Sequence, residues 1–355
     1  MTEGFRYNRY KKSRGRRYHM NKNMRKWLND QLTSPVKKAM PLLSAPACQL
    51  IGMELDEMIA SADLQAQALA KLAERTDSSA LVCMMDLSVE AEAFGSEIRA
   101  GEGEVPTVIG HIVEDEDDAD ALEVPKVGAG RTGIYVDTVK KLSEMVTDKP
   151  IFAGAIGPFS LAARLTEVTE IMYLCYDEPD AVHKVMEKVT DFLIEYCKAF
   201  KEAGADGIAL AEPVTGLLSP ALAEEFSEPY VKKLADAVKS DDFLFIYHNC
   251  GNGTIDMIDS ILRVGADAYH FGNAIDMKKM MEVCPADTVI MGNIDPAGEF
   301  KGGTPESIRK ATLDLMEKCT VHPNFVISSG CDIPAKAPFE NIDAFFAAVS
   351  EFYTK

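Results

Sequence analysis

The sequence predicts a protein of the α/β class that folds into a (β/α)₈ TIM barrel, and three observations support this prediction. Eight apolar, strand-like runs are spread along the chain, and amphipathic helical stretches lie between most of them. The phrases Ala203-Gly-Ala-Asp206 and Val264-Gly-Ala-Asp267 place glycine where a helix would end and the next strand begin. Strands that alternate with helices pair in parallel, and eight such units favour a closed barrel over an open sheet.

The predicted elements follow one another in a regular order. The strands are expected at Pro41–Ala45, Leu81–Asp86, Pro150–Ile156, Gly207–Glu212, Phe243–His248, Asp267–Phe271, Thr288–Asn293 and Phe325–Ser329. A leading helix is expected at Asn23–Ala39, and further helices at Leu55–Ala73, Pro179–Ala203, Leu222–Lys239, Ile255–Val264, Met277–Cys284, Pro305–Cys319 and Phe339–Tyr353. The connection after the second strand is long, and its acidic stretch 113–120 indicates a solvated excursion or a docking face for a basic partner.

Charge divides the chain into two parts. Residues 1–26 hold ten Lys and Arg against the single acid Glu3, without an apolar period, so we expect a basic, disordered arm there and one barrel domain over 27–355. The rest of the chain has 27 basic and 55 acidic residues. Such an acidic body repels phosphates, so we expect no nucleic-acid partner for it.

The apolar content points to a cytoplasmic protein. No apolar run approaches the roughly 18 to 20 residues that span a bilayer, and the start lacks the apolar stretch of a signal peptide, so we expect no membrane association. The eight cysteines are scattered and lie mostly in apolar segments, which favours buried free thiols over a disulfide scaffold. The sequence leaves open whether the protein forms a homo-oligomer.

Polar residues stand at the predicted strand ends, where a barrel of this type gathers its active site. His248 and Cys250 end the fifth strand, and Cys331 follows the eighth in Ser-Ser-Gly-Cys-Asp. One imidazole and two thiols suit Zn²⁺, and three protein ligands leave the open position typical of catalytic zinc. The alternatives are satisfied core polarity and a Cys250–Cys331 disulfide, which a cytoplasmic location disfavours.

Five further strand-end residues are candidates. Asp86 could orient a substrate or act as a first-turn helix acid, and Glu212 could be a fourth zinc ligand or an acceptor for His248. We assign these two to the catalytic set. The expected cofactor pocket includes His270, Asn273 and Asn293, although His270 could be a core residue and Asn293 a turn residue.

Several strand-end phrases resemble the uroporphyrinogen decarboxylase superfamily, and within it the methylcobalamin:coenzyme M methyltransferases and related corrinoid methyltransferases. The resemblance covers about residues 35 to 355. The matching phrases are Met85-Asp-Leu-Ser-Val-Glu-Ala-Glu-Ala-Phe-Gly95, Gly157-Pro-Phe-Ser-Leu161, Gly204-Ala-Asp-Gly207, His248-Asn-Cys-Gly251, Gly292-Asn-Ile-Asp-Pro296, Ser328-Ser-Gly-Cys-Asp-Ile-Pro334 and Pro338-Phe-Glu-Asn341. The superfamily is a (β/α)₈ barrel, in agreement with the strand count.

Two differences separate the branches of this superfamily. The decarboxylases carry an arginine-rich phrase that grips porphyrinogen carboxylates, whereas this chain has Leu43-Ser-Ala-Pro-Ala-Cys48 at the matching place. They also carry a histidine where this chain has Cys331. The methyltransferases instead show the His-x-Cys and distant Cys pattern found here. Some thiol-methylating relatives have a carboxylate near the end of the sixth strand, where this chain has Phe271-Gly-Asn273, so the fourth zinc ligand stays open.

The resemblance therefore implies a zinc-dependent methyltransferase. It would move a methyl group between a methylated corrinoid protein and a small acceptor, a thiol such as coenzyme M, with Zn²⁺ as its own cofactor and the corrinoid supplied by the partner. A corrinoid-dependent demethylase of methoxylated or methylated substrates is one alternative. A cofactor-free decarboxylase of a carboxylated tetrapyrrole is another, and a binding protein with a structural zinc clip is a third.

Overall fold

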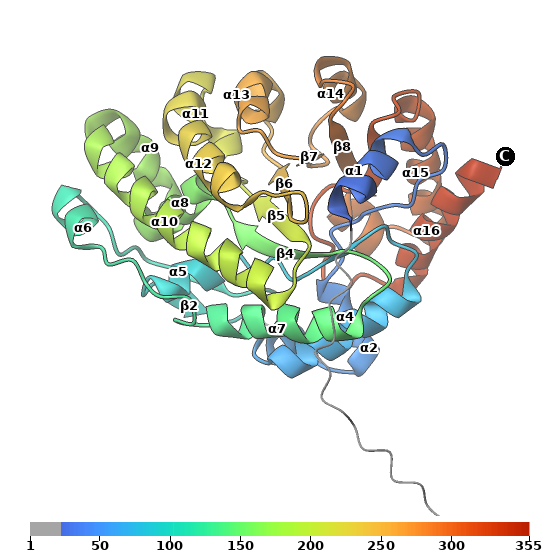
Figure 1. The fold of residues 1–355 in the computed structure, drawn as a ribbon, viewed down its shortest axis with the longest axis horizontal. Helices are drawn as coiled ribbons and strands as arrows, with labels where there is room; N and C mark the ends of the chain where they lie inside the picture. Colours follow the sequence, from blue (N-terminus) through green and yellow to red (C-terminus); the bar gives the residue numbers. More distant parts are fainter. Residues whose placement is uncertain (1–22, 102, 355) are drawn as a thin grey trace, which may run out of the picture.

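The computed structural model describes residues 23–101 and 103–354. Within these residues, seven parallel strands form one curled sheet in the order β1-β4-β5-β6-β7-β8-β9 (Figure 1). The strands are β1 (Leu81–Val82), β4 (Ile151–Ile156), β5 (Gly207–Ala211), β6 (Leu244–Asn249), β7 (Ala268–Phe271), β8 (Val289–Ile294) and β9 (Phe325–Ser329). All seven match strands that the sequence predicts.

Helices surround the sheet (Figure 1). In the described part of the chain, one helix connects each strand position to the next or follows the last one: α4 (Ala62–Arg75), α7 (Thr132–Met145), α10 (Pro179–Ala203), α12 (Glu228–Val238), α13 (Ile258–Arg263), α14 (Met277–Val283), α15 (Pro305–Cys319) and α16 (Phe339–Thr354). Helix α1 (Met24–Thr33) precedes the first strand position. Further elements lie in the connections: α2 (Cys48–Ile51), α3 (Leu55–Ile59), α5 (Val89–Ala93), α6 (Glu116–Ala121), α8 (Pro158–Thr166), α9 (Val168–Asp177), α11 (Pro220–Phe226), and the hairpin of β2 (Glu97–Arg99) and β3 (Thr107–Ile109). The predicted barrel fold is confirmed.

The predicted first strand, Pro41–Ala45, is wrong as a regular strand, although its segment fills the strand position between β9 and β1. Met40 N donates to Ile327 O at 3.1 Å on one side, and Ser79 N donates to Ala39 O at 2.9 Å on the other. Pro41 has no N–H to donate. Side chains replace part of the ladder, because the Ser329 hydroxyl accepts from Leu42 N at 2.9 Å and the Ser328 hydroxyl donates to Met40 O at 2.7 Å.

The barrel interior is filled by every second strand residue, as the period of two requires. The inward apolar residues are Met40, Leu42, Val82, Phe152, Ala209, Ala211, Leu244, Ile246, Ala268, Val289, Met291 and Val326. Helix α1 closes the amino-terminal end of the strands, where the Trp27 ring lies 5.4 Å from Phe152 and its Nε1 donates to Ser79 O. Continuing the same alternation by two residues places His248, His270, Asn293 and Ser328 on the inner face at the opposite end.

Four predicted helices differ from the structure: one ends earlier, two are divided, and one begins later than expected. The leading helix ends at Thr33, before Pro35. The stretch 55–73 is divided into α3 and α4 because the Ser61 side chain caps a new helix start. The stretch 222–239 is divided at Ser227, just before Pro229. A 3₁₀ turn, η3 (Thr254–Met257), precedes α13. The helices α7, α8 and α9 were not predicted, since they lie in the long connections.

The charged segments show two further differences. Residues 1–22 of the predicted arm lie outside the described part of the chain, whereas Met24 to Lys26 belong to α1, capped by Asn23. The acidic stretch contains the short helix α6, and Lys184 pairs there with Glu116 at 2.9 Å. None of the helices in the described residues combines the length and apolar character needed to cross a membrane.

Candidate metal centre

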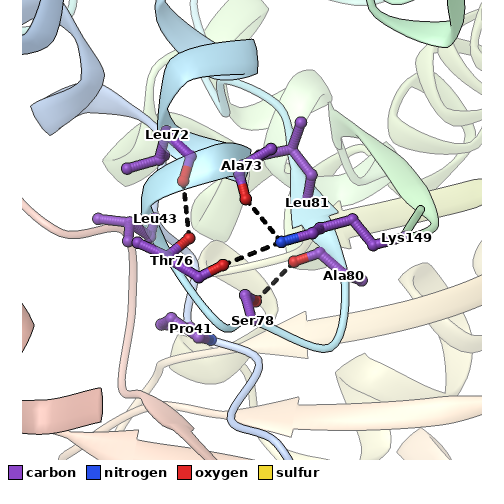
Figure 2. Close-up of a pocket in the computed structure, with 9 residues that line it drawn as sticks. All are labelled: Pro41, Leu43, Leu72, Ala73, Thr76, Ser78, Ala80, Leu81 and Lys149. Atoms are coloured by element: carbon purple, nitrogen blue, oxygen red, sulfur yellow. Dashed lines mark hydrogen bonds between the residues drawn. The ribbon is translucent and has the colours of Figure 1, made fainter. Parts of the chain in front are cut away.

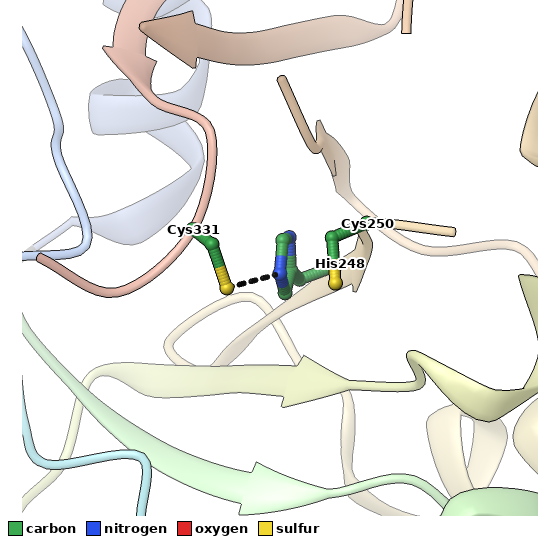
Figure 3. Close-up of side chains that lie close together, drawn as sticks. All are labelled: His248, Cys250 and Cys331. Carbon is green, nitrogen blue, oxygen red and sulfur yellow. Dashed lines mark hydrogen bonds between the residues drawn. The ribbon is translucent and has the colours of Figure 1, made fainter. Parts of the chain in front are cut away.

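His248, Cys250 and Cys331 converge at the carboxyl end of the barrel. His248 is the second-to-last residue of β6, Cys250 follows that strand, and Cys331 follows β9. Their candidate ligand atoms all lie within 4.8 Å of one another, and the side chains point toward a common space (Figure 3). His248 is buried, and both cysteines are partly exposed. The structure thus joins three residues that the sequence places 83 positions apart at most.

The geometry fits zinc. Zn–N and Zn–S bonds of about 2.0 and 2.3 Å at a tetrahedral angle separate the two ligand atoms by about 3.5 Å. His248 Nε2 and Cys331 Sγ are 3.6 Å apart. A nitrogen and two sulfurs are also donor types that bind zinc well, whereas the hard cations Mg²⁺ and Ca²⁺ prefer oxygen ligands. Among the described residues, the group of His, Cys, Asp and Glu that could hold an ion has these three members.

The two thiols interact directly. A hydrogen bond with Cys331 lowers the pKa of Cys250 to about 7, and the same bond is the largest cause that raises the pKa of Cys331. One of the two sulfurs therefore loses its proton near neutral pH, while the other retains it. Both cysteines are free, so the alternative of a Cys250–Cys331 disulfide does not describe this structure.

Glycines allow the loops with the cysteines to pack closely. A Cβ on Gly272, just after β7, would lie 2.5 Å from both Cα and Cβ of Cys250. A Cβ on Gly330 would lie 2.5 Å from Asn273 N. These distances are too short for any side chain, so glycine at both positions lets neighbouring loops set the positions of Cys250 and Cys331.

His270 lies directly behind His248 on the neighbouring strand. The two residues are register partners of β6 and β7, and their Nδ1 atoms are 2.8 Å apart. His270 Nε2 lies 2.7 Å from Ser328 Oγ. Burial and the neighbouring His248 lower the pKa of His270 well below its usual range. Both ring nitrogens thus have partners inside the protein, which favours a supporting position over the predicted contact with a cofactor.

Glu212 follows β5 and is fully buried. Its Oε1 accepts hydrogen bonds from Ser160 N and Thr215 Oγ1, each at 2.9 Å, while Oε2 has no hydrogen-bond partner among the described residues. Burial raises the pKa of Glu212 to about 8, so the side chain is protonated near neutral pH. A protonated carboxyl group can donate a hydrogen bond. Its side chain does not belong to the group of three candidate ligands. Glu212 contacts His248 through the backbone, because Glu212 N donates a hydrogen bond to His248 O.

Asp86 is part of a buried polar network. Arg131 Nη1 pairs with its Oδ2, which also accepts from Tyr135 OH at 3.0 Å, and the Ser88 hydroxyl donates to its Oδ1 at 2.6 Å. Arg131 Nε in turn pairs with Glu92 at 2.7 Å. Asp86 is therefore held by Arg131, Tyr135 and Ser88, and is not a first-turn helix acid with free oxygens.

The two asparagines of the predicted pocket differ. Asn293 is buried, and its Nδ2 donates to Gly272 O at 2.9 Å and to Ile275 O at 2.8 Å, so it holds the loop after β7. Asn273 is exposed and lies against Gly330, beside the Cys331 loop. Asn273 is thus the one of the two whose side chain a ligand at the mouth could reach.

Two features near the strand ends were not predicted: the contact of Ser328 with His270, and the burial of Glu90. Ser328 contacts His270, and the alternation of inward residues along β9 could have identified it. Glu90 is fully buried on α5, where Oε1 accepts from Ile156 N at 3.1 Å and Oε2 has no hydrogen-bond partner among the described residues. Burial raises the pKa of Glu90 to about 7. A glutamate next to other acids in the sequence gave no signal of such burial.

A small cavity lies at the other end of the strands and is not a second candidate for the active site. It is lined by Pro41, Leu43, Leu81 and residues of α4 (Figure 2). Its charged group, Lys149, donates to Ala73 O at 2.7 Å and to Thr76 O at 2.9 Å. Its position at the start of β1 and β4 separates it from the strand ends where barrel enzymes bind substrates.

The fold and the ligand group together define a (β/α)₈ barrel enzyme with a candidate metal centre at the carboxyl ends of its strands. The chain belongs to the uroporphyrinogen decarboxylase (URO-D) family, whose family model matches residues 32–352. The resemblance inferred from the sequence is therefore confirmed.

Relatives of both branches are found. The methylcobamide:CoM methyltransferase MtbA of Methanosarcina mazei is 32% identical over 289 residues, covering 79% of this chain and 83% of the relative. The uroporphyrinogen decarboxylase of Coxiella burnetii is 27% identical over 308 residues, with 82% of each chain covered. Among solved structures, a methyltransferase from Methanosarcina mazei superposes with a TM-score of 0.82 at 26% identity, over 93% of this chain and 99% of the other.

Proposed function

We propose that this protein is a zinc-dependent methyltransferase that moves a methyl group between a methylated corrinoid protein and a small acceptor, a thiol such as coenzyme M. The observation that supports it most is the convergence of His248, Cys250 and Cys331 within 4.8 Å at the barrel mouth. The similarity to a methylcobamide:CoM methyltransferase supports the same donor and acceptor classes.

The three ligands would hold zinc with one position facing the mouth. Bound there, Zn²⁺ would lower the pKa of an acceptor thiol and favour its thiolate. In the overall reaction the methyl–cobalt bond breaks, both electrons stay on cobalt, which goes from Co(III) to Co(I), and a carbon–sulfur bond forms as the thiol proton leaves to solvent.

The protein's own residues would position the reactants. Asp86 is held in one orientation by Arg131 and Tyr135, and Glu212 presents a neutral carboxyl group. We assign to these two side chains the positioning of the acceptor or of the zinc ligands. No proton has to be delivered to the methyl group, so this function needs no general acid.

The decisive experiment follows the cobalt oxidation state by absorbance. Zinc-loaded protein is mixed anaerobically with a methylated corrinoid protein and a panel of thiols, with tetrahydrofolate as a further acceptor. We expect Co(I) to form with at least one thiol. Absence of Co(I) with every acceptor, together with decarboxylation of uroporphyrinogen, would assign the protein to the other branch of its family. Formation of a methylated corrinoid from a methoxylated substrate would identify the demethylase alternative.

The Cys331→Ser variant tests the ligand assignment. We expect it to fold but to lose more than about 100-fold in zinc affinity, because a hydroxyl group is a poor replacement for a thiolate ligand. Methyl transfer should be lost with the zinc. Cys284→Ser is the matched control, since Cys284 is a mostly buried free thiol at the end of α14. Methyl transfer that survives in C331S would show that Cys331 is not a ligand.

A further inference from the structure

We propose that His270 is a positioning residue that sets the tautomer of His248, so that His248 Nε2 presents a lone pair to the metal centre. The inference rests on the proposed function, because the zinc it serves is the zinc of that site. It starts from an unbroken line of hydrogen bonds that runs from His248 through His270 and Ser328 to the carbonyl group of Met40.

The direction of these bonds is determined at the Met40 end. A carbonyl oxygen only accepts, so the Ser328 hydroxyl donates its one proton to Met40 O, at 2.7 Å. Ser328 Oγ must then accept from His270, whose Nε2 lies 2.7 Å away. His270 therefore has its proton on Nε2.

The protonation of His270 in turn determines that of His248. His270 is 1% exposed, and its ring lies beside the Ser328 hydroxyl group, the His248 imidazole and backbone groups of Ser329 and of His270 itself, none of which is a carboxylate. A buried imidazole with such partners stays neutral, so a proton on Nε2 leaves Nδ1 with a lone pair. That lone pair accepts from His248 Nδ1 at 2.8 Å. The proton of His248 is then on Nδ1, which also lies 3.3 Å from the carbonyl oxygen of His270.

As a consequence, His248 has the tautomer required for metal binding before a metal ion binds. His248 Nε2 has no proton and faces Cys331 Sγ at 3.6 Å. Metal-binding histidines usually donate their other N–H group to an acceptor, which orients the ring. Here that acceptor is a second histidine, whose own orientation depends on a serine of β9 and on the segment that replaces the first strand.

The first measurement uses metal-free protein with ¹⁵N-labelled histidine. Long-range ¹H–¹⁵N spectra report which ring nitrogen is protonated, and the chain has only six histidines. We expect the Nδ1–H form for His248 and the Nε2–H form for His270. A protonated Nε2 on His248, or fast averaging between its two forms, would overturn the inference.

The second measurement compares Ser328→Ala with Ser329→Ala in zinc affinity, by competition with a chromophoric chelator. Both serines are fully buried on β9 and bond to the 40–42 segment. The Ser329 hydroxyl accepts from Leu42 N, and of the two hydroxyl groups only that of Ser328 contacts His270, which Ser329 meets through its backbone. We expect S328A to bind zinc about 10- to 100-fold more weakly, as is typical when the partner of a ligand is removed. S329A should stay close to the wild type.

The outcomes separate this inference from the proposed function. Equal zinc affinities of S328A and S329A, with methyl transfer intact in the wild type, would refute the positioning role and leave the function standing. A wild type that binds no zinc would refute the function, and the tautomers of the metal-free protein would still decide whether His270 controls His248. If S328A does not fold, the tautomer spectra of the wild type decide alone.

Discussion

The two cysteine sulfurs at the barrel mouth differ in their protonation although both lie beside His248. Their hydrogen bond makes the first deprotonation easy and the second difficult, as the opposite pKa shifts of Cys250 and Cys331 show. A cation at this position would favour loss of the second proton as well. At the residue scale, the site is therefore a pair of coupled thiols beside the imidazole of His248.

Glu90 allows a test of burial at the residue scale. Its pKa is raised from 4.5 to about 7 because the carboxyl group is buried. Below about pH 4.5 both the folded and the unfolded protein bind this proton; as the pH rises toward 7 only the folded protein keeps it, so the contribution of Glu90 to the free energy of unfolding falls over that range. Glu90→Gln cannot titrate. We expect it to be more stable than the wild type by up to about 3 kcal/mol at pH 8.

Urea unfolding at pH 5 and pH 8 measures this difference. Glu144→Gln is the control, because it removes an exposed carboxylate of α7. If the free energies of unfolding of E90Q and E144Q change with pH in parallel, the carboxyl group of Glu90 is not the source of the pH dependence of stability.

At the scale of elements, strand register positions the ligands and loop packing adjusts them. His248 and His270 are partners in the parallel pairing of β6 and β7, and Asn293 and Ser328 are partners in β8 and β9. The cysteines lie beyond the ladders, in loops that approach one another where glycines lack side chains. A change in one loop should therefore alter a ligand in the other.

Gly272→Ala tests this coupling between loops. The added Cβ would lie 2.5 Å from the backbone of Cys250, so the β6 loop must move. We expect zinc affinity to fall by roughly tenfold or more, although no ligand is changed. Chelator competition measures the affinity, with Gly133→Ala on α7 as the control, where an added Cβ meets its nearest atom at 3.4 Å. Unchanged zinc binding in G272A would mean that the Cys250 loop adapts freely.

At the scale of the whole molecule, the barrel closes through a segment that is not a regular strand. Residues 39–43 connect β9 with the residues before β1, and Ser44 donates to Asp332 at 3.2 Å, next to the Cys331 loop. The interior between the mouth and α1 is packed with apolar side chains. The three candidate metal ligands thus lie on a core that is complete without them.

Removal of zinc should therefore leave the fold intact. We expect the far-ultraviolet circular dichroism to be unchanged after chelation, and the melting temperature to rise again when zinc is returned. Binding at 100 times the dissociation constant stabilises a native state by about 2.7 kcal/mol. Loss of the fold on chelation would instead support the structural clip, because a structural zinc site supplies folding energy.

The sequence alone was sufficient for the parts of this protein that depend on local pattern. Seven of its eight predicted strands, the order of strand and helix, and the residues His248, Cys250 and Cys331 follow from apolar periodicity and from polar residues at strand ends. Periodicity reflects burial of one face, which nearby residues decide. The break at Ser61 was missed, because a serine can equally continue a helix or cap a new one.

Only the tertiary structure decided how distant residues meet. The contacts of His270 with His248 and Ser328, the burial of Glu90 and the closure of the barrel by Met40 and Leu42 join segments that are 22 to 288 positions apart. Such contacts depend on strand register and on which loop covers which strand end. A local pattern has no information on either, since it specifies which face of a strand is buried but not what is opposite.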